Sequence, residues 1–363
     1  MVEGVAKDGG NAVDTQWHLA YLFAHSYPEL FAVQRAQRLK ILFTSTHRTS
    51  FIEEDLKILR SHFDVRHLLT TGIFAPWRIA TALPASDVTL TWFASVYSFF
   101  VVLFARIWRK HSIIVIGGVD ASKEPEINYG IWLSPWKSVL VKWAMRNASK
   151  LLVVDPFFIH QVKRLAQFDG SNIEYVPTGY DATVWYPAGP KEPFVLTVAA
   201  CHDERRMKKK GIDILFVAAT HLPETQFVVI GIFPSLLEKA KRQAPPNVTI
   251  ISFVERRELL TYYQRAKVYC QPSYTEGLPN SLCEAMLCEC IPVGTNVGGI
   301  PTAITDKRFL VQYGDAEGLA HALRTALDEK EAAGRAARSF IAENFPLKKR
   351  EESLLRIIHG LTT

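Results

Sequence analysis

Cysteine is scarce in this chain and unevenly distributed along it. The 363 residues include five cysteines, and all of them lie in the second half. No Cys-x-x-Cys pair or histidine cluster accompanies them, so the sequence predicts neither a disulfide framework nor a zinc site. The close pair Cys288 and Cys290 is interpreted as two small, semi-buried residues at a helix end. Such usage suits a reducing compartment, and we expect a cytoplasmic protein.

A long uninterrupted hydrophobic run is also lacking. Residues 92–108 are nearly continuous in apolar and aromatic residues, but Ser95, Ser98 and Arg106 interrupt them. The stretch is shorter than the ~20 residues that a membrane-spanning helix needs. We interpret it as the end of a strand followed by a buried helix, with a membrane-associated segment as the alternative. Residues 1–15 lack the basic start and apolar centre of a signal peptide, and none is expected.

A strong excess of one charge is absent as well. The chain has 42 lysines and arginines against 36 aspartates and glutamates, a net charge of +6. This mild excess suits anionic small molecules or an acidic membrane surface, and it is too diffuse to predict nucleic-acid binding. With 48% hydrophobic and 21% charged residues, the composition is that of a globular protein. The length predicts about two domains.

The order of apolar runs is typical of an α/β protein. Short apolar runs alternate with stretches of helical periodicity, which indicates parallel strands joined by right-handed crossovers. In the first half the predicted strands are residues 40–46, 65–70, 88–93, 112–118, 151–155 and 173–177, with helices near 16–37, over 52–61 and over 138–148. In the second half they are residues 194–200, 226–231, 248–253, 268–273, 291–295 and 309–313, with helices over 211–221, 255–265 and 281–288 and a helical tail over 319–361.

The fold class that follows is α/β, with two doubly wound Rossmann-like domains and a cleft between them. Residues 179–193 interrupt the alternation with three prolines and two glycines, which is typical of a linker. Ligands of such folds bind at the carboxyl ends of the strands, and here also in the cleft. The predicted divisions are an N-terminal extension over 1–38, a first domain over 39–185, a linker over 186–193, a second domain over 194–340, and a C-terminal helix over 341–363 that packs back on the first domain.

The densest chemical signal lies in residues 272–286 (PSYTEGLPNSLCEAM). A helix is predicted to begin around residues 279–281, where proline suits the first turn. Its free amides and positive dipole end favour phosphate or sugar oxygens. Glu276 precedes this helix and Glu284 lies in its first or second turn, so the two carboxylates can contact different parts of one elongated ligand. The alternative is a capping box, in which Ser281 and Glu284 only satisfy the helix start.

This stretch resembles a known enzyme family. Glu276 and Glu284, with seven residues between them and IPVGTNVGGIP after them, are similar to the Glu-x7-Glu signature of the family 4 glycosyltransferases. Residues 198–213 (VAACHDERRMKKKGID) resemble the strand, basic residue and Lys-Gly turn that open the C-terminal domain of that family. The resemblance covers the C-terminal half well and the N-terminal half in outline. It implies a retaining enzyme of the GT-B fold, with an acceptor-side first domain and a second domain that binds the nucleotide sugar.

The resemblance also implies roles for single residues. Glu276 would contact hydroxyls of the transferred sugar, and Glu284 would accept hydrogen bonds from the ribose. Lys210 and one arginine, Arg206 in preference to Arg205, would stabilise the negative charge on the departing diphosphate. The rest of this basic run is interpreted mainly as solvated surface charge. The donor-binding residues implied are Glu284, Gly277, Leu278, Pro279, Asn280, Ser281, Arg205 and Val254.

Two loops of the first domain supply further candidates. Asp120 follows a predicted strand and the pair Gly117–Gly118, at a place where members of the family often have a histidine. We place Asp120 among the catalytic candidates, as a carboxylate that faces the cleft and contacts the sugar or the acceptor; the alternative is a capping role. His47 and Arg48 are interpreted as residues of an exposed loop, with contact to acceptor or phosphate as the alternative.

Residues 134–150 form a predicted amphipathic helix with repeated basic residues. Trp136, Leu140, Trp143, Ala144 and Asn147 are predicted to share one face. We interpret it as a surface helix whose apolar face packs on the sheet. The alternative is a helix that lies on an anionic membrane.

These features predict a retaining glycosyltransferase that moves a sugar from a nucleoside diphosphate to an acceptor hydroxyl. The resemblance implies a front-face mechanism, in which the acceptor attacks from the side that the diphosphate leaves. The sequence contains no Asp-x-Asp motif, which agrees with the metal independence implied by the GT-B fold, and no cofactor is expected.

The expected partners are a nucleotide sugar and a glycan, lipid-linked or small-molecule acceptor, without nucleic acid. A peripheral contact of the first domain with the inner face of the membrane stays open. Two other functions remain as alternatives. One is a nucleotide-sugar epimerase or phosphorylase on the same fold, and the other is a protein that binds nucleotide sugars without catalysis.

Overall fold

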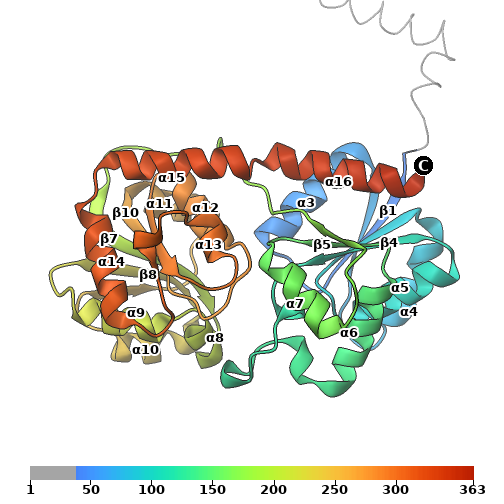
Figure 1. Ribbon diagram of the computed structural model, residues 1–363, viewed down its shortest axis with the longest axis horizontal. Helices are drawn as coiled ribbons and strands as arrows, with labels where there is room; N and C mark the ends of the chain where they lie inside the picture. The colour runs from blue at the N-terminus through green and yellow to red at the C-terminus, as the bar shows by residue number, and fades with distance from the viewer. Residues whose placement is uncertain (1–37) are drawn as a thin grey trace, which may run out of the picture.

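Two parallel sheets of six strands each form the centres of two domains that lie side by side (Figure 1). The computed structural model describes residues 38–363, so the helix predicted near 16–37 lies outside the described residues. The strands are short and rich in buried aliphatic residues, as expected for parallel strands covered by helices on both faces. The architecture is the predicted pair of doubly wound Rossmann-like domains.

The first sheet has the strand order β2-β1-β3-β4-β5-β6. Each predicted strand of this half is present, with ends that differ by one or two residues. The strands are β1 (Lys40–Ser45), β2 (Asp64–Leu69), β3 (Val88–Trp92), β4 (His111–Ile116), β5 (Lys150–Val153) and β6 (Ile173–Tyr175). The helices are α3 (Ser50–His62), α4 (Ala75–Ala82), α5 (Val96–Ile107), α6 (Pro135–Asn147) and α7 (Phe157–Ala166), with 3-10 turns η1 (Leu83–Ala85), η2 (Val119–Ala121), η3 (Pro125–Ile127) and η4 (Ile131–Leu133).

The helices of the first domain divide unequally between the two faces of the sheet. Helices α4, α5, α6 and α7 follow one another along one face, and α3 packs on the other (Figure 1). The crossover from β1 to β2 runs opposite to all later ones, so right-handed connections place α3 away from the other four helices. Under α4 and α5 the sheet buries a small cluster that includes Leu42, Ile79 and Val101.

The second sheet has the strand order β12-β11-β10-β7-β8-β9. Its strands are β7 (Glu192–Cys201), β8 (Gln226–Ile232), β9 (Val248–Ile251), β10 (Ala266–Gln271), β11 (Ile291–Thr295) and β12 (Leu310–Val311). Its helices are α8 (Glu204–Lys209), α9 (Ile212–Thr220), α10 (Pro234–Gln243), α11 (Arg256–Arg265), α12 (Asn280–Leu287), α13 (Ile300–Ala303), α14 (Ala316–Asp328) and α15 (Glu331–Asn344), with the 3-10 turn η5 (Lys307–Phe309). All five cysteines are buried free thiols. Cys288 and Cys290, just after α12, are completely buried rather than semi-buried.

The last helix, α16 (Leu347–Thr362), leaves the second domain and packs on the first beside α3 (Figure 1). Its buried Arg350 donates to both carboxylate oxygens of Asp55, with Nε 3.0 Å from Oδ1 and Nη2 2.7 Å from Oδ2. The Trp92 indole N–H also donates to Asp55, at 2.8 Å. A buried, fully bonded ion pair thus ties the end of the chain to the first domain.

The boundaries between the parts differ from the predicted ones by several residues. Residues 176–191 join β6 to β7, and β7 begins inside the predicted linker over 186–193. The predicted boundary at residue 341 falls inside α15, because the break between α15 and α16 lies at residues 345–346. Pro346 disfavours helical backbone in the residue before it, which explains the position of this break.

Each sheet reverses its winding direction once. In the first sheet β1 lies between β2 and β3, and in the second sheet β7 lies between β8 and β10. The loops that follow such neighbouring strands diverge and leave a crevice at the carboxyl ends of the strands, where ligands bind in this type of sheet. The candidate loops at residues 46–50, 202–210 and 272–279 all follow strands at these two points.

Two helices of the first domain present their apolar residues differently from the prediction. In α6 the residues that pack on the sheet are Val141, Ala144 and Met145, whereas Trp136 is 60% exposed, so the predicted sheet-facing stripe is wrong for Trp136. Helix α5 follows the end of β3 as predicted, but only one side of it is buried. Among residues 38–363, no helix combines the length and the apolar composition needed to cross a bilayer.

Candidate active site

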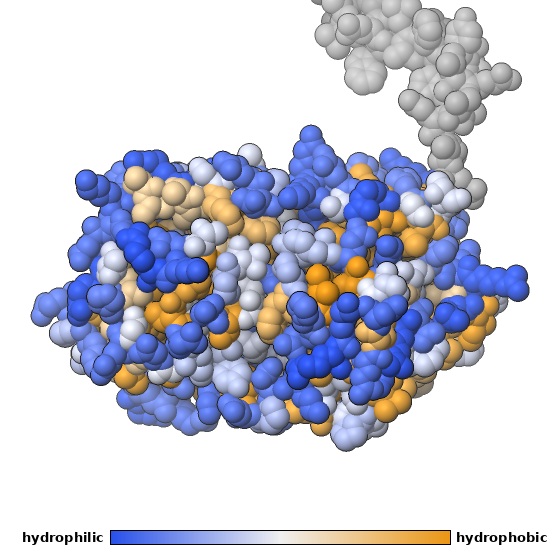
Figure 2. Space-filling model, in the orientation of Figure 1, coloured by the Kyte–Doolittle hydropathy of each residue, from blue (hydrophilic) through white to orange (hydrophobic). Residues whose placement is uncertain are grey.

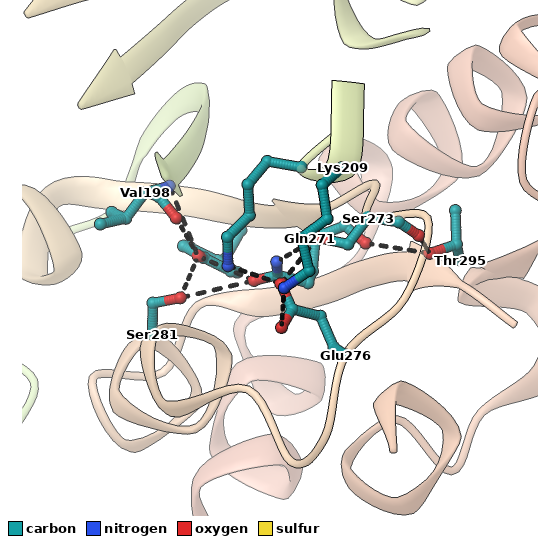
Figure 3. A network of polar contacts seen from close by, with 9 residues as sticks. Val198, Lys209, Gln271, Ser273, Glu276, Ser281 and Thr295 are labelled. Atoms are coloured by element: carbon teal, nitrogen blue, oxygen red, sulfur yellow. Dashed lines mark hydrogen bonds and ion pairs between the residues drawn. The ribbon is translucent and has the colours of Figure 1, made fainter. Parts of the chain in front are cut away.

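Two loops of the second domain meet at the crevice between β7 and β10. The first contains α8, whose last residue is Lys209, and continues to Lys210; the second carries Glu276. The Lys210 ammonium donates to Glu276 Oε1 at 2.5 Å, and Lys209 Nζ lies 3.5 Å from Oε2 (Figure 3). The Ser273 hydroxyl donates to Oε1 at 3.1 Å. The structure therefore brings together the predicted residues Glu276 and Lys210, and it adds Lys209.

The surroundings of Glu276 keep its carboxylate ionised. Burial by itself raises the pKa of Glu276, but the ammonium groups of Lys209 and Lys210 outweigh burial and lower the pKa to about 2. The three side chains are between 11% and 19% exposed, and opposite charges attract more strongly there than in bulk water. A ligand with negatively charged oxygens can compete with the carboxylate for the two ammonium groups.

A chain of hydrogen bonds beneath the loop orients these side chains (Figure 3). The Gln271 amide donates to Ser273 Oγ at 2.8 Å. The Tyr269 hydroxyl lies 2.8 Å from Ser281 Oγ and 3.1 Å from Gln271 Oε1. The Thr295 hydroxyl donates to the Ser273 carbonyl at 2.6 Å. The predicted residue Ser281 thus helps to connect the start of α12 with the loop that carries the carboxylate.

Two glycines allow the loops of the site to approach each other. Gly211, after the lysine run, has a φ of +66°, and a Cβ there would lie 1.8 Å from the carbonyl oxygen of Pro272. Gly298 has a φ of +54°, and a Cβ there would lie 2.0 Å from the carbonyl oxygen of Glu276. Both positions need a residue without a side chain. The Lys-Gly turn of the sequence motif therefore holds the lysine loop against the glutamate loop.

Glu284 lies in the second turn of α12 and is buried. The Tyr263 hydroxyl donates to its Oε2 at 3.3 Å. The N-cap of α12 is Pro279, which has no side-chain acceptor, so the alternative capping box of Ser281 and Glu284 is not formed. Burial raises the pKa of Glu284 to about 8, so this carboxyl group is mostly protonated at neutral pH.

A pocket at the boundary between the two domains reaches Glu284. Residues of α3, of the connection between β6 and β7, and of α11 and α12 line it. Arg256, at the start of α11, donates to Glu54 of α3 at 3.1 Å. The Tyr180 hydroxyl donates to Oδ1 of Asn280 at 3.0 Å. Two predicted donor residues, Asn280 and Glu284, therefore face residues of the first domain across this pocket.

A cavity of about 430 Å³ lies between loops of both domains. The predicted Arg205 and Arg206 line its second-domain side, together with Lys209. Phe93 and His47 lie on its first-domain side. His47 and Arg48 are exposed on the loop after β1, as predicted, and His47 also lines the cavity. His47 and Arg206 both line this cavity, and burial and, to a smaller extent, the charge of Arg206 lower the pKa of His47.

Asp120 does not face the cleft. Its side chain is completely buried, and its carboxylate accepts hydrogen bonds from the backbone N–H groups of Ala94 at 3.0 Å, Gly117 at 3.2 Å and Gly118 at 2.8 Å. Burial, opposed by these bonds, raises the pKa of Asp120 to about 6. The expectation that the Asp120 carboxylate faces the cleft is therefore wrong, because its oxygens hold together the loops after β3 and β4.

The remaining predicted donor residues have different environments. Gly277 lines a small pocket together with Lys209 and Glu276. Leu278 is buried in the core of the second domain. Pro279, the next residue, is the N-cap of α12. Val254, on the loop after β9, packs against the same core, and it is not among the described residues that line the cleft cavity or the pocket of Glu284.

Three residues of the site were missed by sequence reasoning: Lys209, Ser273 and Tyr129. Lys209 contacts the carboxylate, and its ammonium lies 4.5 Å from the centre of the Tyr129 ring. Its place beside the Lys-Gly turn was a usable signal, as was the position of Ser273 at the end of a predicted strand. Tyr129 lies in the irregular segment between η3 and η4, and only tertiary contacts bring it to the cleft.

Solved structures share this architecture, which is the GT-B fold. The sucrose-phosphate synthase of Thermosynechococcus elongatus aligns with a TM-score of 0.72 and 16% identity, over 89% of this chain and 99% of that one. The structure of Anabaena HepE in complex with UDP aligns with a TM-score of 0.72 and 13% identity, over 89% of this chain and all of that one. These likenesses establish the fold.

The second domain also matches known proteins in sequence. Residues 189–340 match the model of the family described as glycosyl transferases group 1. Alpha-maltose-1-phosphate synthase of Mycolicibacterium smegmatis is 28% identical over 230 residues, which cover 56% of this chain and 58% of that protein. The chain therefore spans little more than half the length of this curated relative. The matched domain contains Lys210, Glu276 and Glu284.

Proposed function

We propose that this protein is a glycosyltransferase that moves a sugar from a nucleoside diphosphate sugar to an acceptor hydroxyl. The observation that carries the proposal is the convergence of Lys209 and Lys210 on Glu276 at the carboxyl ends of β7 and β10, beside Arg206 in the cleft. The match of the second domain to glycosyl transferases group 1 supports it. A structural neighbour in complex with UDP supports a nucleotide donor.

The basic residues would bind the diphosphate of the donor. The leaving diphosphate gains negative charge as its bond to the sugar breaks, and cations fixed in a poorly hydrated cleft stabilise that charge. Lys209 and Lys210 would release Glu276 to the sugar hydroxyls when they take up the phosphate oxygens. Arg206 extends the same positive region along the cavity. We propose that these side chains replace a divalent metal ion, as the family 4 resemblance implies.

Glu284 would bind the ribose of the donor at the domain boundary. The carboxyl group of Glu284 is mostly protonated at neutral pH in the unliganded protein. It can therefore donate a hydrogen bond to one ribose hydroxyl and accept a hydrogen bond from another. The pocket beside it is formed by both domains. The donor would therefore extend along the cleft from Glu284 to Glu276.

We propose a front-face reaction that retains the anomeric configuration, as the same resemblance implies. The bond from the anomeric carbon to the diphosphate oxygen breaks, and the acceptor oxygen bonds to that carbon on the same face. The acceptor proton passes to an oxygen of the departing diphosphate. Two observations support a proton acceptor on the donor: a pKa of about 2 makes Glu276 a weak base, and the Asp120 oxygens are bonded to backbone amides.

Substitution of Glu276 tests the proposal. The purified protein is incubated with UDP-, GDP- and ADP-sugars and mixed acceptors in EDTA, and nucleoside diphosphate release is measured. We expect Glu276→Gln to lower the rate on the active donor roughly 100-fold, because the sugar loses a charged hydrogen-bond partner in the transition state. Glu258→Gln, which changes an exposed glutamate of α11, is the matched control and should keep the rate.

Product analysis then separates the alternatives. A retained linkage in the product would support the front-face reaction, and an inverted one would overturn it. Isomerised donor without transfer would indicate an epimerase, and sugar 1-phosphate formation would indicate a phosphorylase. Donor binding without turnover would indicate a binding protein. Unchanged turnover by Glu276→Gln would contradict the proposed site.

A further inference from the structure

Helix α5 has an apolar surface on the side that faces away from the sheet. Its sheet-facing residues are Ser98, Val101, Val102 and Ala105. Arg106 is the one charged residue of the helix. The outward side consists of partly exposed Val96, Phe99, Phe100 and Leu103, followed by exposed Ile107. A helix that is apolar on all sides is normally enclosed by protein or in contact with lipid. Helices α4 and α6 flank α5 and cover part of this side, for example at Phe99, which contacts Trp143 of α6, but the outward residues stay partly or fully exposed.

The helices on either side of α5 extend this surface. Ile73, Phe74 and Trp77, at the start of α4, are 86%, 71% and 72% exposed. Trp136 and Val139, at the start of α6, are 60% and 65% exposed. Helix α5 packs against both helices. Figure 1 places α4, α5 and α6 on the right of the molecule, and Figure 2 shows hydrophobic residues at the surface on the lower right. We call the outward sides of α4, α5 and α6 the aromatic face.

The three helices that carry the aromatic face have charge of one sign. Helices α4, α5 and α6 contain no acidic residue, and their basic residues are Arg78, Arg106, Lys137, Lys142 and Arg146. Tryptophan and phenylalanine next to lysine and arginine are the combination that binds the interfacial region of an anionic bilayer. A protein partner would have to match this surface with acidic residues, whereas anionic lipid headgroups supply the complementary charge along its whole length.

The aromatic face borders the cavity of the cleft. Ser95, the N-cap of α5, and Lys137 of α6 both line that cavity. The first-domain side of the cavity is largely apolar, with Phe93, Val119 and Ile131 among its residues. A molecule held in the bilayer beside the aromatic face can therefore reach the cavity at the ends of α5 and α6.

We propose that the aromatic face docks on an anionic lipid bilayer, and that the acceptor of the reaction is lipid-linked. The first part of this proposal, docking on the bilayer (the docking half), is argued from the exposed surface alone. The second part, a lipid-linked acceptor, rests on the proposed function. Docking places the first-domain side of the cleft against the membrane. The lipid tail of the acceptor stays at the aromatic face while its hydroxyl enters the cavity opposite Arg206 and Lys209.

Co-sedimentation of the full chain with vesicles tests the docking half. The vesicles are phosphatidylcholine alone, or phosphatidylcholine and phosphatidylglycerol in equal parts. We expect binding to the anionic vesicles that weakens at high salt, since screening reduces the attraction of the basic residues. The double variant Phe74→Ser and Trp77→Ser should reduce the affinity roughly tenfold or more, because two exposed aromatic side chains are lost from the contact.

Phe253→Ser is the matched control, since Phe253 is 73% exposed but lies in the second domain; it should bind vesicles like the unchanged protein. Failure of the full chain to bind anionic vesicles would overturn the docking half. Equal binding by the double variant would overturn it as well. A double variant that changes the oligomeric state in the absence of vesicles would assign the aromatic face to a contact between copies, again overturning the proposal.

A comparison of acceptors tests the second part of the proposal, the lipid-linked acceptor. Once a donor has been found, transfer is measured to a lipid extract in the anionic vesicles and to the water-soluble glycans of the same source. We expect transfer to lipid to exceed transfer to soluble acceptors, and the double variant to lower only the former. Equal loss on both acceptors, or transfer to soluble acceptors alone, would overturn the lipid-linked acceptor. Absence of donor turnover in every mixture would instead count against the proposed function, while the vesicle result would stand.

Discussion

At the scale of single residues, the two glutamates of the candidate site have opposite electrostatic environments. Glu276 is paired with two ammonium groups, which hold its pKa near 2 although it is buried. Glu284 is buried with a tyrosine hydroxyl as its hydrogen-bond donor, and its pKa rises to about 8. One side chain is thus always charged at neutral pH, and the other changes its charge near neutrality. This difference suits a charged contact at the sugar and a neutral contact at the ribose.

Glu284→Gln should remove a pH-dependent loss of stability. The pKa of Glu284 is raised on folding, so its favourable contribution is complete below the ordinary value of 4.5 and is lost as the pH rises through about 8. We expect Glu284→Gln to be as stable as the unchanged protein at pH 4 and more stable, by about 2 kcal/mol or more, at pH 9. Urea unfolding at both pH values measures this. A difference that is constant with pH would show that the carboxyl group titrates normally.

At the scale of elements, the site depends on close contact between loops that follow different strands. Gly211 joins α8 to α9 and presses against the end of β10 at Pro272. Gly298, after β11, presses against Glu276. In the first domain, Asp120 performs a similar task with its carboxylate, which binds the backbone of the loops after β3 and β4. Backbone geometry therefore positions the functional side chains on the second domain and shapes the opposing wall of the cleft.

Gly211→Ala should be strongly destabilising, by about 3 kcal/mol or more, because it combines a left-handed backbone with a collision against a carbonyl oxygen. Gly189→Ala is the matched control. Gly189 has a similar φ of +70° but open space around it, so we expect a cost of about 1 kcal/mol. Urea unfolding of both variants decides the matter. Equal costs would mean that the loop relaxes and that the contact with Pro272 is unimportant.

At the scale of the whole molecule, the chain crosses between its domains twice. Residues 176–191 lead from the first sheet to the second, and α16 returns to the first domain. The returning helix is held by the buried pair of Arg350 and Asp55 and by an Arg350 bond to the Val176 carbonyl. Arg256 and Glu54 form a further, partly exposed link across the cleft. The relative position of the two site walls depends on these contacts.

Arg350→Met should cost about 3–5 kcal/mol in unfolding free energy, because it leaves the buried Asp55 carboxylate without its counter-charge. Arg265→Met provides the control, since Arg265 forms a comparable two-pronged pair with Glu192 at the surface. We expect the control to cost less than about 1 kcal/mol. Denaturant unfolding compares the two. A small effect of Arg350→Met would show that α16 is held mainly by its apolar residues.

Much of the molecule follows from local sequence patterns. The strands β1 to β12 lie close to the predicted runs, because a buried parallel strand requires a short apolar segment wherever it occurs. Glu276 and Lys210 were each expected at the donor site on the family resemblance, but the bond between them was not. The β7–β10 neighbourhood that allows this bond belongs to the doubly wound topology. The Lys-Gly turn at Lys210 and Gly211 could also be recognised in the sequence, since a glycine after a basic run is typical of a place where two backbone segments approach closely.

Other features depended on contacts between distant segments. Asp120 was visible as a candidate, but whether it faced the cleft or the backbone amides of Ala94 and Gly118 depended on the packing of two loops. The same holds for α6. Its sequence periodicity is compatible with more than one sheet-facing side, and only the packed structure shows that Val141 and Met145 face the sheet.

The sequence by itself determined the order of the elements, the two-domain division and the location of the candidate loops, because periodicity and turn residues act over a few neighbouring positions. Only the tertiary structure decided that Lys209 joins Glu276, that Tyr129 lies under its ammonium, and that α4, α5 and α6 leave aromatic side chains exposed. These outcomes depend on burial and on charges from distant parts of the chain. Both are properties of the packed molecule.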